Sequence, residues 1–315
     1  MIYWDEISRC GSGGICAAVF LTIGIALPPI LAEGSDYLKN KVARDVITGK
    51  KIIALALTEP GVGSDLANLE TTAVRSGDHY VINGSKKFIT SGMKADYFVL
   101  AARTGGNGMG GVSLILVEAK TPGIKLTRLP TQGWVPSNTA LIVFEDVKVP
   151  VENLIGEENN GFRAIMVNFN HERWVGIIMS SRACRMAVEE SIKYAQERKT
   201  FGKKLIQHQV LRHKLAEMIT RVEIIQSQLE YLTYQMKMGI SPLEIGANIA
   251  FLKVYTTKTM ELCAREASQI FGGNSFLRTG RGAGIERFYR EVRVSAIGGG
   301  SEEVMTDLGL RLSKL

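Results

Sequence analysis

The residue composition of the chain changes at residues 55–65, where the sequence reads LALTEPGVGSD. An apolar run leads there into a Pro-Gly turn that carries hydroxyl side chains and a second glycine. Glycines let backbone N–H groups approach a flat polar ligand closely, although a plain structural turn can have the same composition. The stretch marks the start of a β-rich region and is a candidate ligand loop.

The region 52–149 has the composition of β-strands. Turn residues separate four runs of β-branched or aromatic residues, at 80–82, 97–100, 112–117 and 141–144. The pair Asn83-Gly84 lies between two such runs and predicts a hairpin turn. Strands at this spacing predict a compact antiparallel barrel or sandwich.

The segments on either side predict helices. Up to about residue 40 the chain is small and apolar, and after Pro150 apolar residues recur at three- and four-residue intervals. This periodicity covers 162–197, 209–238, 242–271 and 301–312. In the third segment, Ser241 is a plausible cap with Pro242 in the first turn. Long helices with short breaks pack as an antiparallel bundle, so we expect an α+β fold.

The composition excludes several classes of protein. Of the 315 residues, 45% are hydrophobic and 22% charged, which is globular and not disordered. The formal charge of +7 is spread along the chain and does not predict a nucleic-acid partner. Four cysteines without CxxC spacing predict no disulfide framework and no zinc site. We expect no metal, because His171-Glu172 lacks the second histidine of an HExxH motif.

Two segments bear on location. The apolar run 15–32 is interrupted by Pro28 and Pro29 and has no basic flank, so it predicts a buried helix that ends near the prolines and no membrane span. The last three residues, Ser313-Lys314-Leu315, match the tripeptide that the peroxisomal import receptor reads. We therefore expect a peroxisomal protein that binds this receptor.

Further motifs join the loop at 55–65. They are NGSKKFITSG at 83–92, ERKTFG at 197–202 with His208-Gln209, QIFGGN at 269–274, ERFYRE at 286–291 and IGGGSE at 297–302. In this order and spacing the motifs resemble the acyl-CoA dehydrogenase family over about residues 8–310. The motifs are similar to those of peroxisomal family members from filamentous fungi. The pathway stays open between fatty-acid oxidation and the biosynthesis of a secondary metabolite or toxin.

The resemblance implies an architecture and a cofactor. It implies noncovalent FAD, an acyl-CoA substrate and a homotetramer or homodimer. It also implies a middle antiparallel β-barrel domain at 52–152 and a C-terminal four-helix bundle at 153–315. Compared with the family the chain starts several tens of residues late, so we expect 1–51 to be a truncated N-terminal helical domain.

The resemblance also implies which residues contact the ligands. Thr90 lies beside the flavin ring, Arg198 and Phe201 reach FAD from the neighbouring subunit, and Gly272-Gly273 turns over the pyrophosphate. The implied cofactor contacts are Leu57, Thr58, Ser64, Phe88, Ile89, Thr90, Arg198, Phe201, His208, Gln209, Gln269, Gly272, Gly273, Ser301 and Glu303. The implied substrate contacts are Ser64, Asn170, Arg173, Gly298 and Gly299.

The catalytic base takes one of two positions in the family. Many members carry a Glu in the loop before the last helix, at the position that is Gly299 here. Isovaleryl-type and long-chain-type members carry it on the long helix that opens the bundle, directly before an Arg. The resemblance therefore implies Glu172 as the base and Arg173 as its electrostatic neighbour. The residues alone favour a solvated Glu-Arg pair at an exposed turn.

Three functions remain open from the sequence. The first is FAD-dependent α,β-dehydrogenation of an acyl-CoA to the trans-2-enoyl-CoA, for which the electron acceptor, a flavoprotein or O₂, stays open. The second is an acyl-CoA oxidase that passes electrons to O₂, which the peroxisomal tail favours and the chain length opposes. The third is a non-catalytic relative that binds FAD or CoA.

Overall fold

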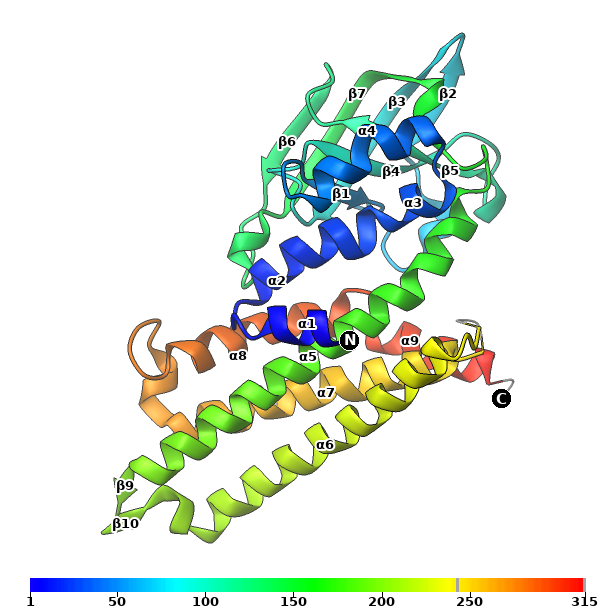
Figure 1. Cartoon of the computed structure of the whole chain (residues 1–315). Coiled ribbons are helices and arrows are strands. Elements are labelled where there is room, and N and C mark those ends of the chain that lie inside the picture. The colour runs from blue at the N-terminus through cyan, green and yellow to red at the C-terminus, as the bar shows by residue number, and fades with distance from the viewer. Residues whose placement is uncertain (242–243, 314–315) are drawn as a thin grey trace. The chain divides into compact units, whose positions relative to one another are not determined.

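The computed structural model describes residues 1–241 and 244–313 (Figure 1). Contacts divide the chain into two compact units. Ala17–His171 forms one unit, which we call the sheet unit. Met1–Cys16 together with Glu172–Leu315 forms the other, which we call the helical unit. The three-part division at residues 52 and 153 stays a prediction.

An eight-stranded sheet occupies the middle of the sheet unit. Its strands are β1 (Ile53–Ala56), β2 (Thr72–Ser76), β3 (His79–Ile89), β4 (Tyr97–Arg103), β5 (Val112–Glu118), β6 (Ile124–Arg128), β7 (Ala140–Pro150) and β8 (Leu154–Ile155). The order is β6-β7-β3-β2-β4-β5-β8, and β1 pairs with β4. The predicted α+β class is confirmed. The sheet is mixed, because β1 and β2 both run parallel to β4 and the other pairs are antiparallel.

Both faces of β4 are buried. Phe98 and Leu100 belong to one core cluster, and Val99 and Ala101 belong to another on the opposite face. Successive side chains of a strand point to opposite faces, so a strand covered on both sides reads as a continuous apolar run. The run at 97–100 is therefore a central strand, and helices cover one of its faces (Figure 1).

Those covering helices precede the sheet in the chain. They are a π-helical segment at Leu21–Ala26, α3 (Pro28–Glu33) and α4 (Asp36–Ile47), and α2 (Gly13–Phe20) leads into the first of them. The predicted helix end near the prolines is wrong, because Pro28 opens α3 and the helical path continues to Glu33. Proline is tolerated in a first helical turn, where its missing N–H has no partner to lose.

In the described part of the chain, Gly13–Glu33 is the one segment long and apolar enough to cross a membrane, and 56% of its apolar window is buried.

The pair Asn83-Gly84 does not form the predicted hairpin turn. It lies inside β3, and the turn between β2 and β3 falls at Gly77 and Asp78. The register of β3 against β7 shifts at Gly84, which is the mark of a β-bulge. Gly84 has φ +142°, and a Cβ there would lie 2.7 Å from Cα of Thr71. The glycine is needed for a close approach of two backbone segments.

Long helices make up the helical unit. The bounds are α1 (Ile2–Ser8), α5 (Gly161–Glu197), α6 (Gln209–Lys237), α7 (Gly246–Phe271), α8 (Ala283–Ile297) and α9 (Glu302–Leu312), and α5 begins within the sheet unit. Between α5 and α6 lies the short hairpin of β9 (Lys199–Thr200) and β10 (Lys203–Lys204). A shared core contains side chains of α5, α6, α7 and α8. The periodicity predicted α5, α6, α7 and α9, and it did not predict α8. Helix α7 begins at Gly246, and the expected first-turn Pro242 lies outside the described residues.

Substitution of Gly84 should test the bulge. Gly84→Ala forces a side chain into an unfavourable backbone conformation and against Thr71, so we expect a loss of about 2 kcal/mol in the free energy of unfolding. Gly61→Ala is the matched control, because no described atom lies within 4 Å of its Cβ position. Urea unfolding of both variants measures the difference. Equal losses would contradict the close approach.

Candidate active site

The carboxyl group of Glu172 is the central feature of the helical unit. Glu172 lies within α5, so it is not at an exposed turn. Its Oε2 is buried and accepts no hydrogen bond from any described residue. Its Oε1 lies 3.7 Å from the position that a Cβ on Gly299 would occupy. The structure thus brings together the two positions at which the family carries its base.

Two basic side chains hold the loop that faces Glu172. This loop joins α8 to α9 and contains Gly298, Gly299 and Gly300. Arg173 Nε donates to the carbonyl of Gly299 at 3.2 Å, and Lys253 Nζ donates to the carbonyl of Gly300 at 2.6 Å. Lys253 also donates to the carbonyl of Ala296 at 3.3 Å. The loop is therefore fixed through its backbone, and its glycines place no side chain in front of the carboxyl group.

Burial sets the charge state of this group. Loss of solvent raises the pKa of Glu172 to about 7, although the positive charges of Arg173 and Lys253 oppose the rise. Burial lowers the pKa of Lys253 to about 8, against the opposing effect of Glu302. At neutral pH the carboxyl group is close to half ionised and Lys253 is largely charged. A base with a pKa near the working pH is suited to proton transfer.

The first residues of α9 border the same loop. Ser301 caps the helix, since its hydroxyl accepts a hydrogen bond from the N–H of Val304. Glu302 accepts a hydrogen bond from Thr257 at 2.6 Å. Hydrogen bonds to its own N–H and to Ser301 hold the pKa of Glu303 below its usual value. Ser301 and Glu303, both predicted cofactor contacts, thus lie beside the loop that Lys253 holds.

In the sheet unit the structure joins two predicted ligand segments. The carbonyl of Thr58 accepts a hydrogen bond from Lys87 N–H at 2.8 Å, which ties the loop after β1 to the end of β3. There Phe88 has φ +62° and exposes 60% of its surface, with Lys87 Nζ 4.9 Å from its ring centroid. Ile89 is buried and Thr90 is half-buried. Leu57, Thr58, Phe88 and Thr90 therefore share one region, and Ser64 is exposed further along the same loop.

The remaining predicted cofactor contacts lie in two places of the helical unit, whereas the predicted substrate contact Asn170 is buried on the part of α5 that belongs to the sheet unit. Phe201 exposes 96% of its surface in the β9–β10 hairpin, and its ring lies 6.3 Å from that of His208. Arg198 and Gln209 flank this hairpin in the sequence. Gln269 is in the last turns of α7, and Gly272 follows with φ +57°. No described atom lies within 4 Å of a Cβ on Gly272 or Gly273, so both leave open space beside the backbone.

Three buried charged residues were missed by the sequence reading. Lys253 lies on the buried side of α7, and Lys86 and Glu59 form an ion pair inside the sheet unit. The available signal was a lysine at an inward-facing position of an otherwise apolar helix or strand. A lysine is buried only when it has partners, so such a position points to a polar network.

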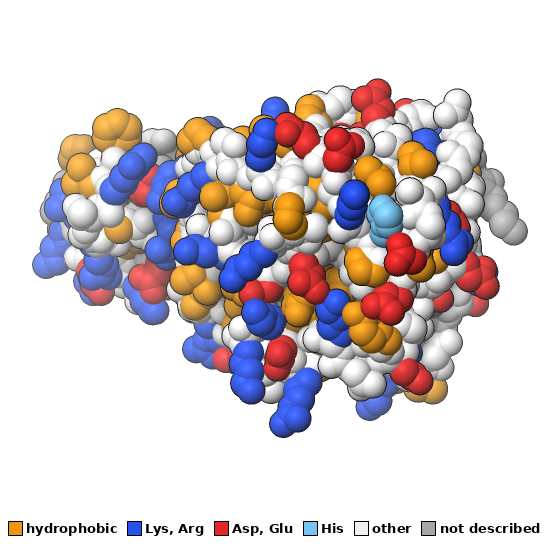
Figure 2. All heavy atoms as spheres, turned by 90° about the horizontal axis from the view of Figure 1, so that it is seen from above, with side chains coloured by type: hydrophobic (Ala, Val, Ile, Leu, Met, Phe, Trp, Pro, Cys, Tyr) orange, Lys and Arg blue, Asp and Glu red, His pale blue; other side chains and the backbone are white. Residues whose placement is uncertain are grey.

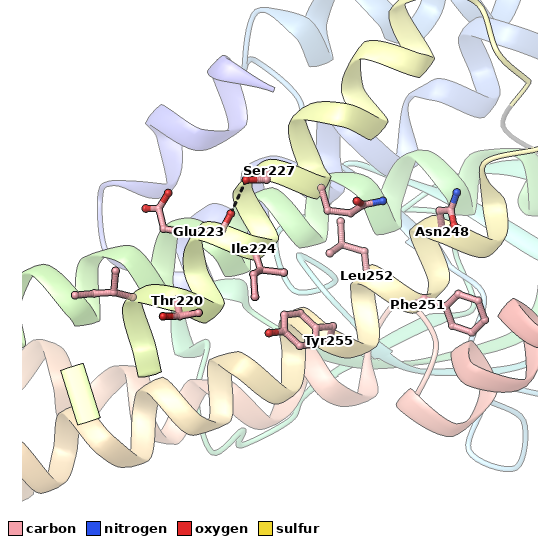
Figure 3. A pocket seen from close by; sticks show the side chains of 10 residues that line it. Thr220, Glu223, Ile224, Ser227, Asn248, Phe251, Leu252 and Tyr255 are labelled. Atoms are coloured by element: carbon pink, nitrogen blue, oxygen red, sulfur yellow. Dashed lines mark hydrogen bonds between the residues drawn. The ribbon is translucent and has the colours of Figure 1, made fainter. Parts of the chain in front are cut away.

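Other surface features do not add to this site. A groove of about 780 Å³ lies between α6 and α7, and Figure 3 shows Ile224, Leu252 and Tyr255 along it. No predicted site residue lines it. On the face drawn in Figure 2, basic and acidic side chains are interspersed. The described residues contain no group of His, Cys, Asp and Glu that could hold a metal ion.

The raised pKa of Glu172 makes stability depend on pH. Above pH 7 the folded protein buries a carboxylate, so Glu172→Gln should raise the free energy of unfolding by roughly 3 kcal/mol at pH 8. The gain should shrink as the pH falls from 7 to below 4.5, where the carboxyl group is protonated in both states. Urea unfolding at a fixed FAD concentration measures it. A pH-independent difference would contradict the burial of this group.

Comparison with known proteins identifies the family. Residues 54–147 match the model of the acyl-CoA dehydrogenase middle domain, and residues 159–312 match that of the acyl-CoA dehydrogenase C-terminal domain. "Acyl-CoA dehydrogenase AFT10-1" of Alternaria alternata is 40% identical over 98% of this chain and 73% of its own length.

Solved structures agree with this. A probable acyl-CoA dehydrogenase from Mycobacterium abscessus is 42% identical with a TM-score of 0.93, over 98% of this chain and 81% of its own. The FAD complex of PigA is 28% identical with a TM-score of 0.91, over 98% and 81%. The chain belongs to the acyl-CoA dehydrogenase family and is an oxidoreductase that acts on CH–CH groups.

Proposed function

We propose that the protein oxidises an acyl-CoA thioester to the trans-2-enoyl-CoA, with Glu172 as the base that removes the α-proton. The observation that carries this proposal is the buried Oε2 of Glu172, which has no hydrogen-bond partner among the described residues and lies beside the open position of Gly299. A buried acceptor without a partner is costly unless a ligand uses it. In our proposal the ligand is the acyl-CoA, and its α-carbon with the proton to be removed lies against this oxygen.

The basic neighbours of Glu172 support its role. Their positive charge opposes the effect of burial, so a substantial fraction of Glu172 is ionised at neutral pH. Because Arg173 and Lys253 bind backbone carbonyls of the 298–300 loop, they also fix the wall opposite the carboxyl group. Positioning and proton removal thus come from the same three side chains.

FAD is the cofactor, and when bound it supplies the acceptor for the β-hydrogen as hydride. Each unit carries residues that fit such a group. In the sheet unit the exposed Phe88 ring offers a flat contact. In the helical unit the open glycines at 272 and 273 leave room for phosphates. Thr58, Ser64 and Thr90 would add hydroxyl groups. In a homodimer or homotetramer, Arg198 and the exposed Phe201 would reach the FAD of a neighbouring copy.

Removal of the carboxylate tests the base. Glu172→Gln should retain FAD and lose at least about a hundredfold in turnover, the low end for loss of a general base. Stopped-flow bleaching of the flavin by an acyl-CoA panel under anaerobic conditions measures this. Glu189→Gln, an exposed position on the same helix, is the matched control and should bleach at the wild-type rate. Full activity in the Glu172→Gln variant would falsify the assignment.

A flavoprotein is the electron acceptor in our proposal, and O₂ is the alternative that a peroxisomal location favours. Reoxidation of the bleached flavin in air, with peroxide measured directly, separates the two. Rapid peroxide formation without another acceptor would identify an oxidase.

We also propose peroxisomal import through Ser313-Lys314-Leu315, of which Lys314 and Leu315 lie outside the described residues. Ser313 follows α9 directly as its C-cap, and the upstream Arg311 is exposed. Deletion of residues 313–315 should leave a fluorescent fusion protein in the cytosol of a fungal cell, whereas the intact chain should be punctate. Unchanged punctate signal would exclude this tail as the import signal.

A further inference from the structure

Glu59 and Lys86 form an ion pair inside the sheet unit, away from the surface. Lys86 is 0% exposed and Glu59 is 5% exposed, and Lys86 Nζ lies 2.7 Å from Oε1 of Glu59. Burial of two charges is costly, so a buried pair does not by itself indicate stability. A role beyond stability must come from the groups that the pair holds.

The pair holds both ends of one loop. The carboxylate of Glu59 accepts the N–H of Glu70 at 2.7 Å and the N–H of Thr71 at 2.9 Å. Lys86 Nζ donates to the carbonyl of Leu57 at 2.9 Å. Residues 57–59 and 70–71 are thereby tied to one charged pair, and the residues between them, including Ser64, form a closed loop on the surface.

The same pair joins this loop to the end of β3. Lys86 is two residues before Phe88, and the next residue, Lys87, donates its N–H to the carbonyl of Thr58. Glu59 stays ionised, because Lys86 and the N–H donors outweigh the effect of burial and hold its pKa below the usual value. Burial lowers the pKa of Lys86 to about 8, so the pair is charged at pH 7.

We propose that Glu59 and Lys86 are positioning residues that hold the 57–71 loop and the Phe88–Thr90 segment in the arrangement that binds FAD. The inference rests on the proposed function, in which Thr58, Ser64, Phe88 and Thr90 contact the cofactor. Both side chains are buried, so they act through the backbone groups that they bind. Their effect is to order the binding surface in advance, so that binding does not have to order it.

The double variant Glu59→Leu/Lys86→Met tests this in the full chain. It removes both charges together, so no unpaired charge stays buried. We expect amide hydrogens of Glu70 and Thr71 to exchange faster than in the wild type, and the Kd for FAD to rise at least about tenfold, as when the competent loop is populated a tenth of the time. Glu59→Asp keeps the charge and shortens its reach, and should weaken FAD binding in the same direction.

Lys51→Met/Asp96→Asn is the matched control. That ion pair spans 2.8 Å in the same unit and ties the start of β1 to the start of β4 without touching the loop. The control should keep the wild-type Kd for FAD. Wild-type FAD affinity in both Glu59 variants, unchanged exchange at Glu70 and Thr71, or an equal loss in the control would each overturn the inference. Failure of the wild-type chain to take up FAD would instead refute the proposed function, and the inference with it.

Discussion

The candidate site depends on one buried carboxyl group that has no hydrogen-bond partner among the described residues. Burial alone would keep Glu172 protonated at neutral pH, and a protonated carboxyl group cannot accept a proton. Arg173 and Lys253 oppose this with positive charge and also bind carbonyls of the loop in front of it. The geometry of the loop and the charge state of the base are therefore set by the same two residues.

The sheet unit uses a comparable arrangement. There a buried lysine and glutamate bind backbone groups at both ends of the 57–71 loop, and Ser64 between these ends is exposed. In both units buried charged side chains bind the backbone of a loop that contains glycines. Gly61, Gly63 and Gly299 leave space free of side chains, and the charged side chains order the backbone beside them.

Much of the fold could be predicted from the sequence, because helix and strand periodicity reports burial directly. The runs at 97–100 and 112–117 are central strands, and α5, α6 and α9 lie close to the predicted ranges. Asn83-Gly84 misled the prediction, because a bulge and a hairpin turn ask for the same residues and only the pairing of β3 with β7 distinguishes them. Pro28 misled it because proline can open a helix as well as end one.

Only those residues of the candidate site that the family resemblance identifies could be predicted. The resemblance placed Glu172 at the base position, whereas the residues alone favoured a solvated pair. Lys253, Lys86 and Glu59 were missed, because charged side chains are usually exposed and their burial depends on contacts with residues far away in the sequence.

The pH dependence of flavin bleaching tests whether Glu172 is the base. With an acyl-CoA below saturation under anaerobic conditions, we expect a bleaching rate that rises about tenfold per pH unit and levels off near pH 7, where Glu172 becomes ionised. A rate that is already level above pH 5, or that shows the same rise in Glu172→Gln, would contradict the claim that this buried carboxyl group is the base.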